Sequence, residues 1–139
     1  MLFRSFRAAN HSRASIISTL LQTMSAVELN LPYPPSVNTY WGFQGHRRFL
    51  TAKALEFKKA VAHAVSLMPI RFADDRLEIN VHLHAPDKRL RDIDNVLKPL
   101  LDALVHAGLF NDDSQVDLIT IIRKDSIKGG ACRVSIRTY

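Results

Sequence analysis

The sequence predicts one α+β domain, in which a small mixed sheet of about four strands is covered by two main helices in the order β-α-β-α-β-β. Three observations predict this class. Apolar and polar residues alternate over several short segments, apolar stripes with helical spacing mark two others, and 139 residues with 47% hydrophobic content suit a single core. No apolar run approaches the roughly 20 residues of a membrane span, so we expect no membrane partner.

The elements of the first half follow in order along the chain. A short strand is expected over residues 26–31, followed by a long proline-broken loop over residues 32–50. An apolar stripe then predicts a helix over residues 51–67, with Thr51 as its N-cap. Strict alternation predicts a second, half-buried strand over residues 76–85.

The second half begins with a helix whose buried face is rich in Leu and Val and which Gly108 terminates. Pro99 is a misfit, because proline within a helix forfeits a hydrogen bond outside the first turn. Either the regular helix begins just before Pro99, or residues 95–98 form a kinked opening turn. Residues 115–124 and 131–138 have strand character on either side of a Gly-Gly turn, which predicts a hairpin.

The first 23 residues differ in composition from the rest of the chain. They hold three arginines and no acidic residue, which is typical of a mitochondrial transit peptide. The alternative is an upstream start codon, because Met24 opens a natural domain start. In both cases we expect an extension over residues 1–23 and a single domain over residues 24–139.

The charge balance of the chain is basic, with 19 Lys and Arg against 13 Asp and Glu, a net charge of +6. Without the three arginines of the extension, 16 basic residues face the same 13 acidic ones, so the domain carries +3. This modest excess is compatible with a nucleic-acid partner. The single cysteine, Cys132, forms no internal disulfide and no His/Cys cluster has zinc spacing, which indicates a reducing compartment and no structural zinc.

The loop over residues 32–50 mixes aromatic and basic side chains, among them Trp41, Phe43, Arg47 and Arg48. Long ordered loops more often have a function than serve only as connections. This mixture of side chains suits contacts with a nucleic-acid backbone and stacking on bases. The alternative is that the rings cover the core while the arginines are solvated. The sequence leaves both interpretations open.

Acidic residues flank the second helix, with Asp92 and Asp94 before it and Asp112 and Asp113 after it. Hydrolysis of a phosphodiester needs an activated water, a clamp on charged oxygens and a stabilised leaving group, and Mg²⁺ held by two or three carboxylates supplies all three. Lys98 lies four residues after Asp94, so its ammonium can hold the scissile phosphate or stabilise charge as the bond breaks.

The same residues also have ordinary structural explanations. An aspartate before a helix is a favoured cap, Asp94 with Lys98 is an ordinary surface pair, and adjacent acids in a loop are common. The two acidic loops meet only if the helix is short or the second loop folds back. The residues alone therefore permit a metal site without requiring one.

Four segments read in order resemble the RusA family of crossover junction endodeoxyribonucleases. They are Leu-Pro-Tyr-Pro-Pro-Ser-Val-Asn at 31–38, Arg-Asp-Ile-Asp-Asn-Val-Leu-Lys at 91–98, Asp-Ala-Leu at 102–104 and Gly-Leu-Phe-Asn-Asp-Asp-Ser-Gln-Val at 108–116. The resemblance covers about residues 27–138 with family-like spacing. No single segment is specific, whereas the ordered set is.

The resemblance implies a Holliday junction resolvase, a homodimer that binds four-way junctions and nicks two strands of like polarity during recombination and repair. It implies Asp92, Asp94 and Asp113 as catalytic and metal-binding carboxylates for Mg²⁺, with Mn²⁺ as a possible substitute. It also implies Lys98 as a catalytic cation, and Asp112 matches the family pattern without an assigned role. Paired cuts on a two-fold substrate likewise call for two active sites related by two-fold symmetry.

The residues expected to contact DNA are Arg91, Arg89, Arg47, Arg48 and Asn95. Junction binding depends on phosphate positions and branch shape, so a basic surface without a recognition helix is suitable. Two alternatives remain, a module that binds branched DNA without cutting it and another structure-specific nuclease, for example one acting on flaps.

The resemblance also bears on where the protein is located. It implies a cytoplasmic protein of prokaryotic or phage origin. A mitochondrial location is expected only if residues 1–23 are a transit peptide, because the family pattern does not need this extension.

Overall fold

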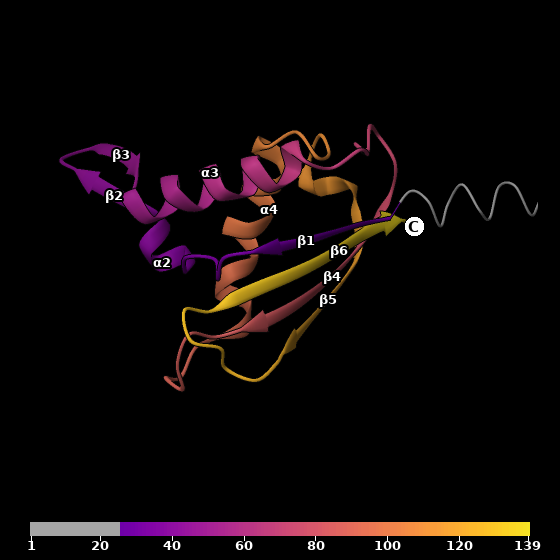
Figure 1. The fold of residues 1–139 in the computed structure, drawn as a ribbon. Helices are drawn as coiled ribbons and strands as arrows, with labels where there is room; N and C mark the ends of the chain where they lie inside the picture. Colours follow the sequence, from indigo (N-terminus) through magenta and orange to yellow (C-terminus); the bar gives the residue numbers. More distant parts are fainter. Residues whose placement is uncertain (1–25) are drawn as a thin grey trace, which may run out of the picture.

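The computed structural model describes residues 26–139, which form two layers: a four-stranded sheet and two helices on one of its faces (Figure 1). The strands of the sheet, in spatial order, are β1 (Val27–Leu31), β6 (Ala131–Thr138), β4 (Leu77–His84) and β5 (Val116–Arg123). The helices are α3 (Ala52–Ser66) and α4 (Leu97–His106). The predicted α+β class is therefore confirmed. The expected extension over residues 1–23 lies outside the described residues.

The core lies between the sheet and the two helices. In β4 every second side chain, from Leu77 to Leu83, is buried, whereas the alternate positions are polar and half-buried. β1 and β6 follow the same period of two, which places one apolar face against α3 and α4. Within residues 26–139 no helix is long and apolar enough to cross a membrane.

The two last strands do not form the predicted hairpin. β5 pairs with β4 in parallel, and β6 pairs with the other edge of β4 in antiparallel orientation. The connection over residues 124–130 passes around the end of β4, where Lys124 N–H donates to Leu83 O (2.8 Å) and Ile127 N–H donates to Ala85 O (3.0 Å). Alternation in the sequence fixes which face of a strand is buried, but it does not choose the neighbouring strand.

Both main helices begin as their local sequences require. The hydroxyl of Thr51 accepts a hydrogen bond from Ala54 N–H, so Thr51 is the N-cap of α3 as predicted. A short 3₁₀ helix, η1 (Ile93–Val96), precedes α4, and Pro99 then falls in the first turn of α4. No helical N–H is needed at that position, which removes the misfit. Gly108 ends the helical segment with a φ of +80°.

The predicted loop over residues 32–50 contains regular structure that the sequence analysis missed. It holds α2 (Val37–Tyr40) and an antiparallel hairpin of β2 (Trp41–Gln44) and β3 (Arg47–Leu50). Figure 1 shows this hairpin projecting past the N-terminal end of α3, away from the four-stranded sheet. The missed signal was the two-residue Gly-His turn, in which Gly45 has a φ of +62°.

Gly108→Ala is expected to lower the free energy of unfolding by about 1–2 kcal/mol. In the left-handed backbone conformation at this position, a Cβ comes too close to the following carbonyl oxygen. Apart from Gly108 itself and its two chain neighbours, a Cβ at this position meets no atom within 4 Å, so the cost is one of local conformation. Gly108→Asn should cost less, since asparagine tolerates this conformation. Urea unfolding followed by circular dichroism measures both variants, and equal losses would contradict the explanation.

Candidate active site

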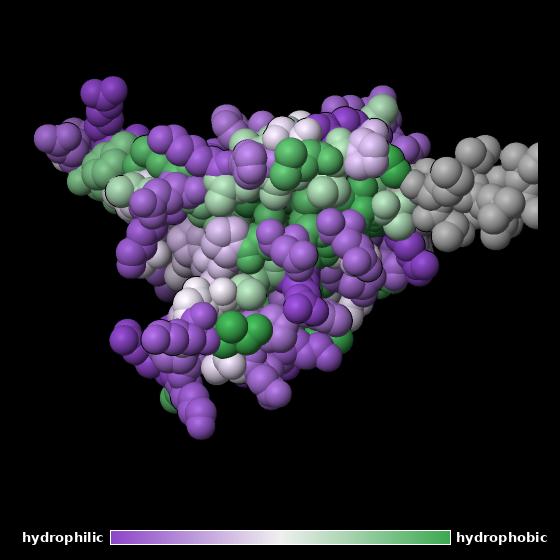
Figure 2. Space-filling model, viewed as in Figure 1, coloured by the Kyte–Doolittle hydropathy of each residue, from purple (hydrophilic) through white to green (hydrophobic). Residues whose placement is uncertain are grey.

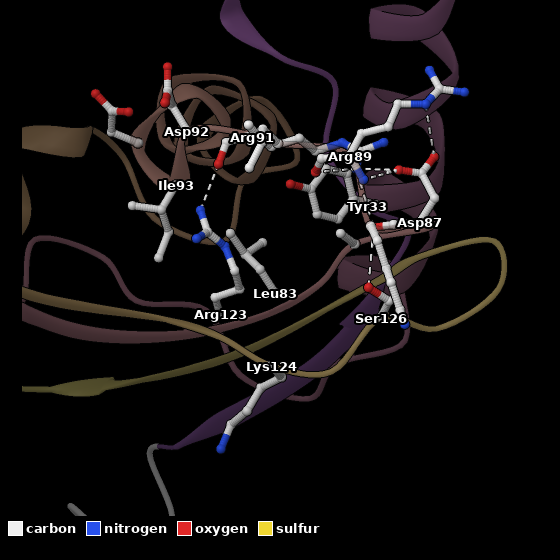
Figure 3. Close-up of a pocket in the computed structure, with 14 residues that line it drawn as sticks. Tyr33, Leu83, Asp87, Arg89, Arg91, Asp92, Ile93, Arg123, Lys124 and Ser126 are labelled. Carbon is white, nitrogen blue, oxygen red and sulfur yellow. Dashed lines mark hydrogen bonds and ion pairs between the residues drawn. The ribbon is translucent and has the colours of Figure 1, made fainter.

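A hollow of about 620 Å³ lies at the edge of the sheet where β4 and β5 end (Figure 3). Its walls come from Tyr33, the end of β4, the turn over residues 87–91, the start of η1 and the end of β5. Because β4 and β5 are parallel, their carboxyl ends meet at one edge, which is the usual place for ligands beside parallel strands.

Asp92 and Asp94 both line this hollow. Asp92 is at the N-cap position of η1 but makes no side-chain cap hydrogen bond, and Asp94 lies in the first turn. Within residues 26–139, neither carboxylate has a hydrogen-bond or ion-pair partner. The capping explanation for Asp92 and the surface pair between Asp94 and Lys98 are therefore not realised. Two exposed carboxylates instead face the same hollow.

Lys98 is paired with Asp113, although 15 residues separate them in the sequence. Its Nζ lies 2.9 Å from Asp113 Oδ2, and this hydrogen bond is the main cause that raises the pKa of Lys98. Asp113 opens the short 3₁₀ helix η2 (Asp113–Gln115), which precedes β5. The loop after α4 thus folds back, so the structure brings Lys98 and Asp113 together.

Asp112 has a local structural role, unlike its neighbour Asp113. Its carboxylate caps η2 by accepting hydrogen bonds from the Ser114 hydroxyl and from Ser114 N–H (3.1 Å), and these bonds lower the pKa of Asp112. Gln115 is buried and completes a capping box, because its Oε1 accepts from the N–H groups of Asn111 and Asp112, both at 2.8 Å. The role of Gln115 was missed, although the Asp-x-x-Gln spacing is a capping-box signal.

The three expected metal ligands are not gathered into one site. In the part of the chain that the structure describes, no three His, Cys, Asp or Glu side chains are grouped so that they could hold a metal ion. The donor chemistry of Asp92 and Asp94 nevertheless fits Mg²⁺, which prefers oxygen ligands. Magnesium commonly takes one or two carboxylates and completes its shell with waters and substrate phosphates.

Basic side chains surround the other side of the hollow. Arg91 Nη1 donates to Asp87 Oδ1 (2.7 Å), and Arg89 Nε lies 3.5 Å from Asp87 Oδ2. Arg123, the last residue of β5, donates from Nη2 to Arg91 O (2.6 Å). Figure 3 shows Asp92 on one side, Asp87 with Arg89 on the other, and Arg123 reaching the backbone between them.

Asp87 and Arg123 were missed as site residues. Asp87 with Arg91 has the spacing of four residues that favours an ion pair, so this signal was present in the sequence. No local signal identifies Arg123, because its place depends on the parallel pairing of β5 with β4.

A second hollow of about 400 Å³ flanks Asp92 on the side of α2, and Ser36, Thr39, Lys53 and Asn95 are among the residues that line it. Of the expected DNA-contacting residues, Arg91 lines both hollows, Arg89 lines the first and Asn95 lines the second. Arg47 and Arg48 line neither hollow and lie in strand β3. The expected DNA contacts thus form two groups, one beside the carboxylates and one on the hairpin.

Comparison with known proteins identifies the class. The family profile described as Endodeoxyribonuclease RusA matches residues 32–138. The crossover junction endodeoxyribonuclease of Enterobacteria phage HK97 is 40% identical over 114 residues, covering 81% of this chain and 95% of that protein. Relatives of the same name from Enterobacteria phage 82 and Escherichia coli K12 are 33% and 32% identical over 115 residues, with the same coverage.

These matches span almost the whole domain, and they place the chain in the class of the endodeoxyribonucleases. The chain belongs to the Endodeoxyribonuclease RusA family. The resemblance noted in the sequence is thereby confirmed.

The ion pair of Asp87 predicts a pH dependence of stability. The hydrogen bond from Arg91, with one from the Arg89 backbone, lowers the pKa of Asp87 from 3.8 to about 2. Since the folded pKa lies below the unfolded one, the charged carboxylate stabilises the fold above about pH 4 and loses this contribution as the pH falls towards about 2. Asp87→Asn should therefore be less stable than wild type at neutral pH, and the difference should vanish near pH 2.

Urea unfolding of both proteins across this range measures the difference. A gap between wild type and Asp87→Asn that stays constant from about pH 5 to about pH 2 would contradict the assigned pKa. Asp75→Asn is a matched control, because Asp75 is exposed and its carboxylate has no partner among the described residues.

Proposed function

We propose that this protein is a metal-dependent endodeoxyribonuclease that resolves Holliday junctions by paired nicks in strands of like polarity, in DNA recombination and repair. One observation carries the proposal: Asp92 and Asp94, without partners among residues 26–139, face a hollow that arginines border. The names of the relatives, at 32–40% identity, support the same substrate.

Asp92 and Asp94 are the proposed ligands of Mg²⁺, or of Mn²⁺ in its place. When bound, such an ion supplies an activated water and neutralises charge on the phosphate. Two carboxylates that line one hollow and have no partner among residues 26–139 offer the oxygen ligands that Mg²⁺ prefers. Arg89 and Arg91 would hold the neighbouring phosphates, and they orient the DNA without reading its sequence.

Lys98 is the proposed catalytic cation, and Asp113 positions it. In the protein without DNA, the ion pair holds the ammonium in place and neutralises Asp113. Because the Lys98 side chain is 67% exposed, a DNA phosphate can compete with Asp113 for the ammonium at small cost. Release of Lys98 would free the Asp113 carboxylate, which becomes a third metal ligand only if it moves closer to Asp92 and Asp94 than it lies in this structure.

A homodimer is the proposed working form. One chain carries one Asp92–Asp94 pair, and symmetric cuts on a two-fold junction need two pairs related by two-fold symmetry. Sedimentation equilibrium of the protein alone and with the junction tests this, and a monomer under both conditions would contradict it. The named relatives come from phages and Escherichia coli, which supports action in the bacterial cytoplasm, where this DNA lies.

Asp92→Asn and Asp94→Asn are each expected to abolish Mg²⁺-dependent nicking of a synthetic four-way junction, because each removes a metal-binding charge. Junction binding should stay within about twofold of wild type, since phosphate contacts dominate affinity. Gel assays of nicking and gel shifts without metal measure the two effects. Asp75→Asn, the same chemical change at an exposed position outside both hollows, should cut normally.

The same assays decide between the alternatives. Wild-type protein that binds the junction but makes no nicks with Mg²⁺ or Mn²⁺ would be a branched-DNA-binding module. A panel of junction, flap, duplex and single strands of identical sequence tests the substrate, and faster cutting of flaps would replace the resolvase by another structure-specific nuclease.

Lys98→Ala is expected to reduce the nicking rate at saturating junction by roughly 100-fold, the loss typical of one removed charge-stabilising group. The free energy of unfolding should change by less than about 1 kcal/mol, because exposed ion pairs contribute little. Single-turnover nicking and urea unfolding separate these effects. A variant that cuts at the wild-type rate would show that Lys98 serves only the ion pair with Asp113.

A further inference from the structure

The β2–β3 hairpin carries exposed aromatic rings that no core requires. Phe43 is 71% exposed and Phe49 is 44% exposed. Figure 2 shows apolar and hydrophilic surface side by side on the projection that Figure 1 labels β2 and β3. Exposed aromatic side chains grouped on one projecting element generally mark a binding surface.

Each face of the hairpin combines rings with a basic group. The register pairs Trp41 with Leu50 and Phe43 with Arg48, so these four residues share one face. On it, the Arg48 guanidinium carbon lies 3.7 Å from the centroid of the Trp41 ring. The other face holds Phe49, whose ring lies directly over Gly42.

Gly42 is needed for this arrangement. A Cβ on Gly42 would come within 2.5 Å of the Phe49 ring, so a larger residue would displace that ring. The Phe49 ring therefore lies against the strand at Gly42, while the exposed Phe43 and the Trp41–Arg48 pair lie on the opposite face of the hairpin.

The root of the hairpin is fixed firmly to the body of the protein. Thr51 N–H donates to Tyr40 O (3.1 Å), and the Thr51 hydroxyl donates to Thr39 O (2.7 Å), which closes the two ends of the hairpin. The Tyr40 ring is buried, and its hydroxyl donates to Asp102 of α4, which also pairs with Lys58 at 3.2 Å. The exposed rings thus belong to an anchored arm, which keeps the entropy cost of binding low.

The root of the arm also lies beside the candidate active site. Thr39, in α2 and two residues before the first strand of the arm, lines the second hollow together with Asp92 and Asn95. A DNA strand with a phosphate at Asp92 therefore has the arm within reach of neighbouring nucleotides.

The charge of this segment favours a polyanion. Residues 29–55 contain no acidic residue, whereas Arg47, Arg48 and Lys53 are basic. A two-fold contact between two copies of this arm would bring two basic, acid-free surfaces together, and such like-charge contacts are unfavourable. Rings with arginines and no acids are the combination that binds unpaired nucleic acid by stacking.

We propose that the β2–β3 hairpin binds the branch point of the DNA, where unstacked bases lie on Phe43 and on the Trp41–Arg48 pair while Arg47 contacts a phosphate. This surface deepens the proposed function, because it rests on a branched DNA substrate. It adds shape recognition to the phosphate contacts beside Asp92. Duplex DNA without a branch offers no free base face and gains little from the arm.

The test uses binding without metal, so that it is independent of cleavage. A four-way junction with 2-aminopurine at the branch reports stacking by its fluorescence. Phe43→Ala should bind the junction at least about fivefold more weakly and lose the stacking signal, while duplex binding changes by less than twofold. Phe43→Tyr should restore both, whereas Phe43→Leu, which keeps apolar area without a ring, should not.

Tyr139→Ala is the matched control, because Tyr139 is an aromatic residue with 70% exposure outside the arm. It should bind like wild type. Equal binding by Phe43→Ala and wild type would overturn the proposal, and so would a change in oligomeric state on Phe43→Ala, which would make the arm a contact between copies. Thermal unfolding of Phe43→Ala at the wild-type midpoint excludes misfolding.

The outcomes separate this inference from the proposed function. If wild type cuts junctions but Phe43→Ala binds them normally, the inference fails and the nuclease stands. If the stacking signal depends on Phe43 but wild type makes no nick with Mg²⁺ or Mn²⁺, the binding role of the hairpin is supported and the proposed nuclease activity is contradicted.

Discussion

The parallel pairing of β4 with β5 is the constraint on which the candidate site depends. Parallel neighbours cannot be joined by a tight turn, so the chain must cross back between them, and α4 makes this crossing. The crossing begins directly after β4, and Asp92 and Asp94 therefore emerge at the edge where β5 ends in Arg123. The same crossing requires the chain to return to the start of β5, which brings Asp113 back towards Lys98.

Neighbouring carboxylates hold the cations around the site in ion pairs that can be broken when DNA binds. Arg91 is held by Asp87 and Lys98 by Asp113, and in both pairs the side chains are partly exposed. Exposed pairs are weak in water, so they orient the cations yet yield to a phosphate. Each cation that turns to the DNA releases counterions, and junction affinity should then depend steeply on salt.

Local sequence signals predicted where each helix and strand lies far better than they predicted which strands pair with each other. The cap at Thr51, the alternation in β4 and the glycine at position 108 placed helices and strands within one or two residues. The partner of β5 was missed, because its pairing with β4 depends on contacts far apart in the chain. The β2–β3 hairpin was missed although its two-residue Gly-His turn was a local signal. In the site, chemistry made Asp92 and Lys98 candidates and the family resemblance gave them their roles, whereas Arg123 enters only through tertiary structure.

The position of β6 has a consequence for biosynthesis. β6 follows the other described elements in the chain, yet it lies between β1 and β4. Until residues 131–138 have left the ribosome, β1 has no neighbour and one edge of β4 is open. The nascent chain therefore cannot complete its sheet from the N-terminus onwards. A premature stop anywhere before β6 removes the centre of the sheet, so it yields an aggregation-prone fragment and not a shortened nuclease.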